Sequence, residues 1–185
     1  MSWEFDFLYL LQELHSPVLD KIMVAVTTLG DAGLIWIVLA VVLMFTKKYR
    51  KCGITMAVAL IIMLVVGNGV LKNIFMRERP CWIDTSIALL IENPHDYSFP
   101  SGHTFSSIAA ATVILLRSKK AGIAAMVLAV LIAFSRMYLF VHFPTDILAS
   151  LVLGAITAVV AHLLVEKYYD KLAAKLSERK NRNEG

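Results

Sequence analysis

Long apolar runs separated by short polar junctions dominate this chain. A run that is nearly free of charge and approaches roughly 20 residues is long enough to cross a bilayer as a helix. Two of the runs are shorter than that, but polar or basic residues mark their ends clearly. The pattern therefore predicts five membrane-spanning helices, at residues 32–46, 53–71, 104–116, 121–141 and 145–165.

The first 31 residues follow a different pattern. Apolar positions recur at helical spacing on one side of the wheel while Asp6 and Glu13 lie elsewhere, as in helices that lie flat in the membrane interface. Ser16 and Pro17 then predict the start of a second short helix. We therefore expect residues 1–31 to form short interfacial helices that do not span the membrane.

Composition supports a membrane protein. The chain is 58% hydrophobic and has a mean hydropathy of +0.70, which is too apolar for an ordinary soluble domain. The expected fold is all-α, a polytopic membrane helix bundle that forms a single domain over residues 1–185. Cys52 and Cys81 fall at opposite ends of the predicted spans, so no disulfide between them is expected.

Basic residues are concentrated on one side of this predicted topology. Of the 18 Lys and Arg residues, four lie at residues 47–51, three at 117–120 and six at 166–185. Lys and Arg collect on the cytoplasmic side of membrane proteins. The tail at residues 166–185 is therefore predicted to be cytoplasmic, and the opposite junctions extracytoplasmic. Topology and a solvated tail explain the net positive charge, so no nucleic-acid partner is expected.

Three polar clusters lie at junctions on the predicted outer side. The first contains Lys72, six further residues and then Arg79-Pro80. Positions seven apart share a face of a continuous helix, and a lysine beside an arginine fork suits a phosphate group with several free oxygens. Arg77 is expected to point elsewhere. The alternative is a pair of basic side chains that snorkel at the membrane edge.

The second cluster is Pro100-Ser101-Gly102-His103, immediately before the predicted span at residues 104–116. A helix N-terminus presents free amides and a positive dipole end, so it can bind an anion. Ser101 can add a donor, Gly102 lets the backbone approach closely, and His103 can give a proton. A plain helix cap beside a surface histidine is the alternative.

The third cluster contains Arg136, His142 and Asp146, where one apolar segment ends and the next begins. Ionisable groups at such a junction are costly to keep and indicate a functional site. Arg136 offers a second guanidinium to phosphate oxygens. Asp146, on the same helical face as His142 or across the helix start from it, can accept a hydrogen bond from one imidazole nitrogen and leave the other free as a nucleophile or base. An aspartate that caps a helix beside an interfacial histidine is the alternative.

A metal site is not expected, although His103, His142 and Asp146 are possible ligands. The three cationic side chains of the clusters would repel a metal ion. No metal and no other cofactor is therefore predicted. The loop at residues 81–99 could cover the site, because loops of that length are often functional or mobile.

Taken together, the clusters resemble the signature of the type 2 phosphatidic acid phosphatase / vanadium haloperoxidase superfamily. That signature is lysine, six residues and arginine-proline; then proline-serine-glycine-histidine; then serine-arginine, five residues, histidine, three residues and aspartate. The chain contains all three blocks in this order and with this spacing, between Lys72 and Asp146. Many members of the family have six spans, whereas five are expected here, with the amphipathic N-terminus in place of one.

The resemblance implies a role for each matching residue. His142 would be the nucleophile and form a phosphohistidine, Asp146 would orient it, and His103 would protonate the leaving group. The phosphate and its transition state would be bound by Lys72, Arg79, Ser101, Gly102 and Arg136. Because these cations and amides supply the electrostatic stabilisation, the reaction would need no metal.

The resemblance also implies a small bacterial plasma-membrane phosphatase that acts on a lipid phosphate at the outer face. Undecaprenyl diphosphate, hydrolysed to undecaprenyl phosphate and phosphate, is the preferred substrate, and phosphatidylglycerol phosphate and phosphatidic acid are alternatives. A lipid-phosphate binding or transport protein is an alternative from another class, but a transporter should carry its charges near the bilayer midplane. Haloperoxidases of the superfamily are soluble, so the high hydropathy argues against that activity.

Overall fold

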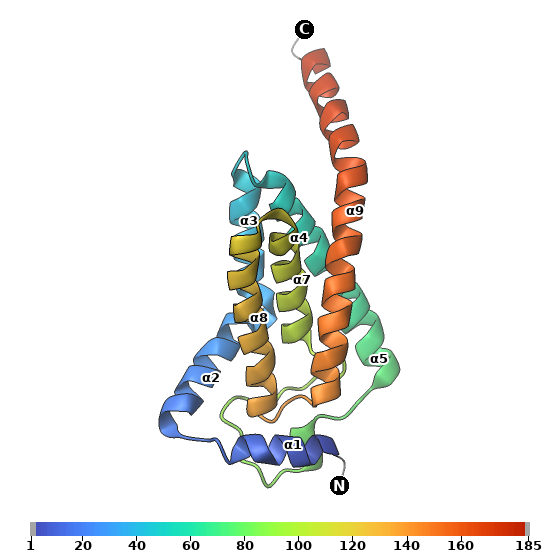
Figure 1. Ribbon diagram of the computed structural model, residues 1–185. Helices are drawn as coiled ribbons and strands as arrows, with labels where there is room; N and C mark the ends of the chain where they lie inside the picture. The colour runs from blue at the N-terminus through green and yellow to red at the C-terminus, as the bar shows by residue number, and fades with distance from the viewer. Residues whose placement is uncertain (1–2, 184–185) are drawn as a thin grey trace.

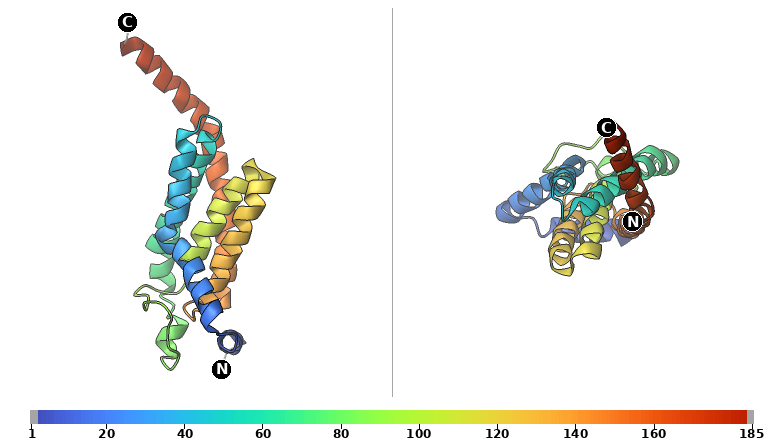
Figure 2. Two further views of the ribbon diagram at one scale, coloured as in Figure 1. Left: turned by 90° about the vertical axis from the view of Figure 1, so that its left-hand side faces the viewer. Right: turned by 90° about the horizontal axis from the view of Figure 1, so that it is seen from above.

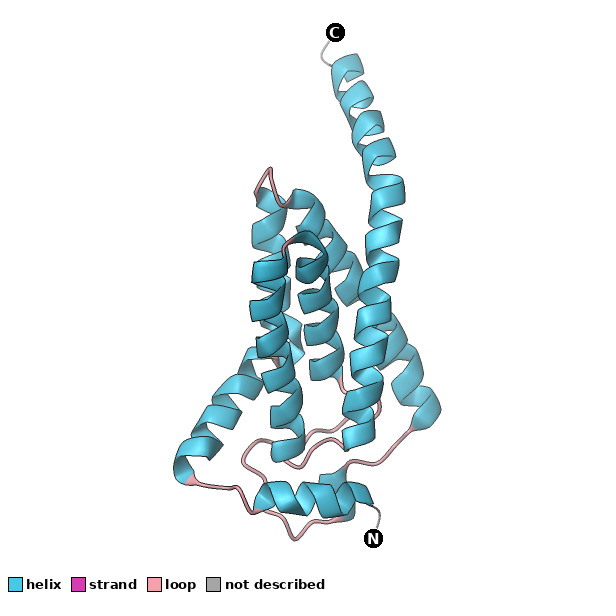
Figure 3. Cartoon of the chain, viewed as in Figure 1, coloured by secondary structure: helices cyan, strands magenta, loops and turns pink. Residues whose placement is uncertain are grey.

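The computed structural model of the chain describes residues 3–183, with side chains to residue 169 and at Lys171. The remaining side chains of the predicted basic tail lie outside the described residues. The described residues form helices joined by turns and one long loop, without a strand among them (Figure 3). The all-α fold predicted from the sequence is confirmed. In chain order the elements are α1 (Trp3–Gln12), α2 (Pro17–Leu29), the 3₁₀ turn η1 (Asp31–Gly33), α3 (Leu34–Phe45), α4 (Arg50–Met63), the π-helix η2 (Leu64–Leu71), α5 (Lys72–Phe75), α6 (Pro80–Ile83), α7 (Gly102–Arg117), α8 (Lys119–Tyr138) and α9 (Pro144–Asn183).

α7 is the central helix of the bundle, and it packs against α4, α8 and α9 (Figure 1). Its small residues permit this arrangement, because Ala109 and Ala110 are fully buried and let neighbouring backbones approach closely. The backbones of α7 and α9 also approach closely, at Gly154 of α9. A Cβ atom added at Gly154 would lie 2.9 Å from Cβ of Ile108 and 3.0 Å from the carbonyl oxygen of Phe105.

The helix lengths support a membrane protein but not the predicted number of spans. Within residues 3–183, three helical segments are long and apolar enough to cross a bilayer, at Arg50–Ile83, Lys119–Tyr138 and Pro144–Tyr169. Pro17–Leu29 and Asp31–Phe45, bent by 40° at their junction, would make a fourth if the pair forms one broken span. The predicted count of about five is not confirmed, because α7 has only 16 residues and α3 only 12.

α1 lies crosswise at one end of the bundle, below the long helices in Figure 1. Its apolar side packs on the connection between α8 and α9: Leu8 is fully buried, and the ring of Phe5 lies 5.3 Å from that of Phe143. This position agrees with a helix in the membrane interface. α2 instead slants upward to the bend at η1, where Ala32 and Gly33 both have positive φ angles of 50° and 67°.

The polar clusters gather at the same end of the bundle as α1. This end holds the loop between α6 and α7 and the connection between α8 and α9 (Figure 2). The turns after α3 and after α7, where the sequence places groups of basic residues, lie at the opposite end. The fold therefore separates the cationic clusters from the cationic turns, as the sequence pattern predicts.

The segment from Lys72 to Pro80 is not the continuous helix that the sequence analysis assumed. α5 ends at Phe75, Met76 is left-handed with φ of 41°, and Arg79 is extended with φ of −83° and ψ of 153°. The residue before a proline is disfavoured in the helical conformation, so the helix cannot run through Arg79. The prediction that Lys72 and Arg79 share a helical face is wrong.

Candidate active site

A cavity of about 580 Å³ opens at the end of the bundle that holds the polar clusters. Six of the eight predicted site residues line it: Lys72, Arg79, Gly102, His103, Arg136 and His142. The other two are fully buried: Ser101 directly precedes the lining residue Gly102, and Asp146 lies 3.5 Å from the lining residue His142. Side chains from α5, α7, α8 and two connecting segments are thus brought to one place.

Lys72 and Arg79 converge on one carboxylate in the loop before α7. Asp96 pairs with the Lys72 ammonium group, and its Oδ1 accepts a hydrogen bond from Nη2 of Arg79 at 2.6 Å. Nε of Arg79 also donates to the Asp96 carbonyl oxygen at 2.6 Å. Both cationic side chains are buried, whereas the Asp96 side chain is 56% exposed. An acidic group from a solvent-facing loop therefore engages the two cations that the sequence predicts as phosphate ligands.

Asp96 is held in its ionised form by this contact. Partial burial opposes ionisation, but the hydrogen bonds and positive charges of Lys72 and Arg79 together outweigh it and lower the pKa of Asp96 to about 2. The Lys72–Arg79 pair therefore already binds an anion in the structure, and that anion belongs to the protein.

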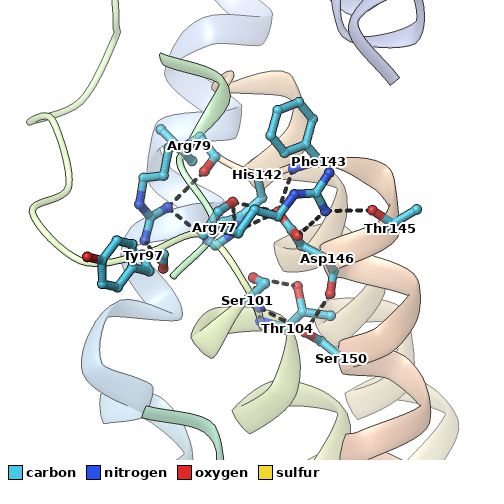
Figure 4. A network of polar contacts seen from close by, with 12 residues as sticks. Arg77, Arg79, Tyr97, Ser101, Thr104, His142, Phe143, Thr145, Asp146 and Ser150 are labelled. Carbon is cyan, nitrogen blue, oxygen red and sulfur yellow. Dashed lines mark hydrogen bonds and ion pairs between the residues drawn. The ribbon is translucent and has the colours of Figure 1, made fainter. Parts of the chain in front are cut away.

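The two ring nitrogens of His142 have different partners (Figure 4). Nε2 lies 3.0 Å from Nη1 of Arg79, which can only donate, so Nε2 is the acceptor. Nδ1 therefore carries the proton, and it lies 3.5 Å from Oδ2 of Asp146 and 3.4 Å from Oγ of Ser98. This tautomer leaves Nε2 unprotonated, as a nucleophilic histidine requires, and His142 lines the cavity.

Hydrogen-bond donors fix both carboxylate oxygens of Asp146. Oδ2 accepts from Oγ of Ser98 at 2.5 Å and from the amide of Phe143 at 2.8 Å. Oδ1 accepts from Nη1 of Arg77 at 2.6 Å. Because α9 begins at Pro144, His142 and Asp146 lie across the helix start and not on one helical face. The carboxylate is therefore rigidly placed beside the imidazole.

His142 is held in the neutral state. Burial lowers its pKa, and the positive charges of Arg79, Arg136 and Lys72 lower it further, to well below the usual histidine value. Neutral imidazole is the form whose second nitrogen is a free nucleophile or base.

His103 lies in the first turn of α7 and lines the same cavity. Its Nε2 is 2.9 Å from Oδ1 of Asp31 in η1. Gly30 leaves room for this contact, since a Cβ atom there would lie 2.8 Å from Cδ2 of His103. Asp31 therefore fixes the orientation of the histidine that the sequence predicts as the proton donor.

Ser101 caps the start of α7, whereas Gly102 faces the cavity. Oγ of Ser101 accepts hydrogen bonds from the hydroxyl of Thr104 at 3.1 Å and from its amide at 3.5 Å, so it caps α7. The amide of Ser101 donates to Oγ of Ser150 at 2.9 Å. Gly102 lines the cavity. In this structure the hydroxyl of Ser101 has the capping role that was the alternative for this cluster.

Arg136 has a donor that the protein does not use. Its Nη1 donates to Oγ1 of Thr27 at 2.7 Å, whereas its Nε is buried and has no hydrogen-bond partner among the described residues. A buried donor without a partner is costly. This guanidinium is therefore suited to bind an anion in the cavity that it lines.

The structure adds side chains that the sequence analysis did not assign to the site: Glu4, Asp31, Arg77, Asp96 and Ser98. Arg77 does not line the cavity with Lys72 and Arg79, but its Nη1 donates a hydrogen bond to Asp146 behind His142. No local sequence signal identifies Asp31 or Ser98, because their importance depends on which distant residues they meet. Asp96 lies in the loop at residues 81–99, which the sequence analysis gave only as one that could cover the site.

The described part of the chain has no group of three or more histidine, cysteine and carboxylate side chains that could hold a metal ion. Three arginine or lysine side chains line the cavity instead. Metal independence of the reaction stays a prediction.

Comparisons with known proteins point to one family. The family model described as PAP2 superfamily matches residues 50–170. Undecaprenyl-diphosphatase from Sulfolobus acidocaldarius is 37% identical over 122 residues, which are 65% of this chain but only 59% of that protein. Undecaprenyl-diphosphatase BcrC from Bacillus subtilis is 33% identical over 146 residues, which are 77% of this chain and 72% of that protein.

Two crystal structures share the fold. LpxE from Aquifex aeolicus superposes with a TM-score of 0.77 at 26% identity, over 87% of this chain and 95% of that chain. A transmembrane PAP2 type phosphatidylglycerolphosphate phosphatase from Bacillus subtilis superposes with a TM-score of 0.69 at 29% identity, over 89% of this chain and 83% of that chain.

Proposed function

The chain belongs to the PAP2 superfamily, and we propose that it is an integral-membrane lipid phosphatase that hydrolyses undecaprenyl diphosphate to undecaprenyl phosphate and inorganic phosphate. The family expected from the three sequence blocks is confirmed. The substrate is the one in the names of the relatives from Sulfolobus acidocaldarius and Bacillus subtilis. One observation carries the proposal: a cavity in which buried cations surround the unprotonated nitrogen of a neutral histidine.

The proposed reaction has two steps. Nε2 of His142 attacks the terminal phosphorus, a nitrogen–phosphorus bond forms, and the bond from phosphorus to the bridging oxygen breaks. His103 gives its proton to the leaving undecaprenyl phosphate. Water then attacks the phosphohistidine and returns a proton to His103, and the nitrogen–phosphorus bond breaks to release inorganic phosphate. Asp146 stabilises the positive charge that the imidazole gains in the first step.

The cations of the cavity stabilise the negative charge on the transferred phosphoryl group. Lys72, Arg79 and Arg136 line the cavity and are buried, so their charges act in a medium of low dielectric constant. The free Nε of Arg136 and the amide region at Gly102 complete the binding site. A substrate phosphate would replace Asp96 as the partner of Lys72 and Arg79.

An apolar cavity next to the site suits the hydrocarbon part of the substrate. It has a volume of about 270 Å³ and lies between α3 and the α4–η2 helix. Four residues line both this cavity and the phosphate cavity: Ala32, Gly33, Met63 and Leu64. A lipid tail in the apolar cavity would therefore place its phosphate directly among the cations.

The site is proposed to face the extracytoplasmic side of the plasma membrane, with the C-terminus in the cytoplasm. The support is the concentration of Lys and Arg in the turns at the opposite end of the bundle. Five spans are proposed, with α7 as a short buried span and α2 at the membrane boundary.

Phosphatidylglycerol phosphate is the second candidate substrate, because the structural relative from Bacillus subtilis is named for it. Phosphatidic acid fits the same cationic cavity and is a further alternative. A lipid-phosphate transporter is less well supported, since the loop before α7 and the connection between α8 and α9, which carry site residues, lie at one end of the bundle and not at its middle (Figure 2).

The test is phosphate release by the purified protein in detergent, with excess chelator present. Undecaprenyl diphosphate, phosphatidylglycerol phosphate and phosphatidic acid are offered in parallel to the wild type and to His142→Ala. We expect release from undecaprenyl diphosphate to be fastest, to survive the chelator and to vanish in the variant. Release that needs a divalent metal, or that persists in His142→Ala, would contradict the proposed mechanism, and no release from any lipid would contradict the function.

A further inference from the structure

Asp146 carries the most enclosed negative charge at the site, and one cation compensates it. Its side chain is fully buried. Among the Lys and Arg residues that the structure describes, Arg77 alone forms an ion pair with it, through Nη1 and Oδ1 at 2.6 Å. The other carboxylate oxygen has only neutral donors and His142 as neighbours. A buried charge is costly unless it is paired and hydrogen-bonded, so Asp146 depends on Arg77 for its one ion pair with a described Lys or Arg side chain.

Arg77 differs from the other cations in where it lies. Lys72, Arg79 and Arg136 line the phosphate cavity, whereas Arg77 and Asp146 are not among its lining residues. Arg77 instead lies over the ring of Phe143, with its guanidinium carbon 4.2 Å from the ring centroid. It therefore acts on the carboxylate behind His142 and not on the phosphate in front of it.

The N-terminal helix α1 holds Arg77 in this place. Oε2 of Glu4 accepts from Nη2 of Arg77 at 2.7 Å. Oε1 of Glu4 accepts from the hydroxyl of Thr145 at 2.6 Å and from its amide at 3.3 Å. Nη1 of Arg77 donates to the same hydroxyl at 2.7 Å. Glu4 thus ties Arg77 to the first turn of α9, the turn that carries Asp146.

We propose that Arg77 and Glu4 are positioning residues for the nucleophile, in a chain of contacts that runs from Glu4 through Arg77 and Asp146 to His142. Arg77 holds the carboxylate of Asp146 in place, Asp146 holds the Nδ1 side of the His142 ring, and Glu4 fixes Arg77. The helix α1 then has a function beyond membrane association, because it completes the support of the catalytic histidine. This inference rests on the proposed phosphatase reaction.

The test compares Arg77→Gln, Arg77→Lys, Glu4→Gln and the double variant Arg77→Gln/Glu4→Gln with the wild type. Glu78→Gln is the matched control, because Glu78 is exposed and adjacent to Arg77 in the chain. The measured quantities are kcat and KM for undecaprenyl diphosphate. The second readout is the ¹⁵N chemical shifts of the His142 ring, which report its tautomer without any turnover.

We expect Arg77→Gln to lower kcat about 10- to 100-fold, by analogy with the hydrogen-bond partners that orient metal-binding histidines, with KM within about twofold of the wild type. Arg77→Lys should recover part of kcat. Glu4→Gln should have a smaller effect, and the double variant should be no worse than Arg77→Gln alone, because Glu4 acts through Arg77. In Arg77→Gln the ring shifts should move from the Nδ1-protonated form toward a mixture of tautomers.

Wild-type kcat and an unchanged tautomer in Arg77→Gln would overturn the inference, as would a loss expressed only as a higher KM. If Arg77→Gln does not fold, Glu4→Gln and Arg77→Lys decide: wild-type values for kcat and the ring shifts in both would overturn it. A wild-type protein that releases no phosphate would contradict the proposed function, while the ring shifts would still show whether Arg77 positions His142.

Discussion

Nη1 of Arg79 lies 3.0 Å from Nε2 of His142. The guanidinium that is expected to bind a phosphate oxygen is therefore in direct contact with the nitrogen that is expected to attack the phosphorus. When a phosphate enters, Arg79 can exchange this contact, and its bonds to Asp96, for phosphate oxygens. Binding of the phosphate would therefore both release Nε2 of His142 from Arg79 and bring the phosphorus that Nε2 attacks.

Replacement of Arg79 should affect both substrate binding and the chemical step. Arg79→Gln removes a buried charge that contacts the phosphate and its transition state, so we expect a higher KM and a kcat lower by about 10²- to 10³-fold. Steady-state kinetics of phosphate release measure both values. This pattern contrasts with the loss of kcat alone that is expected for Arg77→Gln, and equal effects of the two variants would contradict the different roles assigned to the two arginines.

Removal of the Asp96 charge should make the site bind small anions more tightly. Asp96 forms ion pairs with both Lys72 and Arg79, so a phosphate would have to compete with it for these two cations. Asp96→Asn should therefore lower the inhibition constant of inorganic phosphate or orthovanadate about two- to fivefold, a modest effect because the side chain is partly exposed to solvent. Inhibition assays on wild type and Asp96→Asn test this, with the exposed Glu13→Gln as control. An unchanged or weaker inhibition would show that the carboxylate does not compete.

The proton that His103 donates should matter most for poor leaving groups. His103→Ala should lower turnover of phosphatidic acid by about 10²- to 10⁴-fold, because its diacylglycerol would have to leave as an unprotonated alkoxide. Turnover of p-nitrophenyl phosphate, whose leaving group needs no proton, should fall much less. The ratio of the two rates is the readout. Asp31→Asn should also lower the rate with phosphatidic acid relative to that with p-nitrophenyl phosphate. The effect should be smaller than in His103→Ala, because Asp31 only orients His103.

The stability contributed by His142 should decrease in acid. The pKa of His142 is lowered by folding, so the unfolded chain takes up a proton near the usual histidine pKa of about 6.5 that the folded protein does not bind. The contribution is fully present above that pH and is lost as the pH falls below it. Thermal unfolding of wild type and His142→Gln in detergent should show the wild type losing its relative stability between pH 8 and pH 5. A difference in unfolding temperature between wild type and His142→Gln that stays constant from pH 8 to pH 5 would contradict a neutral, buried His142.

The close contact between α3 and α4 should be sensitive to a single methyl group. A Cβ atom at Gly53 would lie 2.5 Å from the carbonyl oxygen of Ala40 and 2.6 Å from the amide nitrogen of Met44. Gly53→Ala should therefore destabilise the protein by about 1–3 kcal/mol, as expected of overpacking. Gly69→Ala is the control, since the nearest atom to its added Cβ is 3.8 Å away. Equal unfolding temperatures of the two variants would contradict the packing described.

The sequence predicts much of the fold because helical periodicity and apolar length are local properties. The same local signals fail where tertiary packing decides. α7 has only 16 residues and packs against α4, α8 and α9, so the length of its apolar run does not decide whether it spans the membrane. The segment between Lys72 and Arg79 bends at Met76, and only Pro80 signals that the helix must end before it.

The motif residues of the site are readable from sequence spacing, but their partners are not. Asp31 and His103 are 72 residues apart, and Glu4 and Thr145 are 141 apart, so no spacing rule connects them. The position of Asp96 could not be predicted from the sequence either, because its loop has no regular secondary structure. The hydroxyl of Ser101 lies in a recognisable block, yet in the structure it caps α7.

The most direct test of the account is to trap the covalent intermediate. The protein is mixed with undecaprenyl diphosphate labelled on the terminal phosphate, quenched in base within milliseconds, and digested for mass spectrometry. The account predicts an acid-labile, base-stable phosphoryl group on His142, absent in His142→Ala. A label on another residue, or rapid phosphate release by His142→Ala, would contradict His142 as the nucleophile.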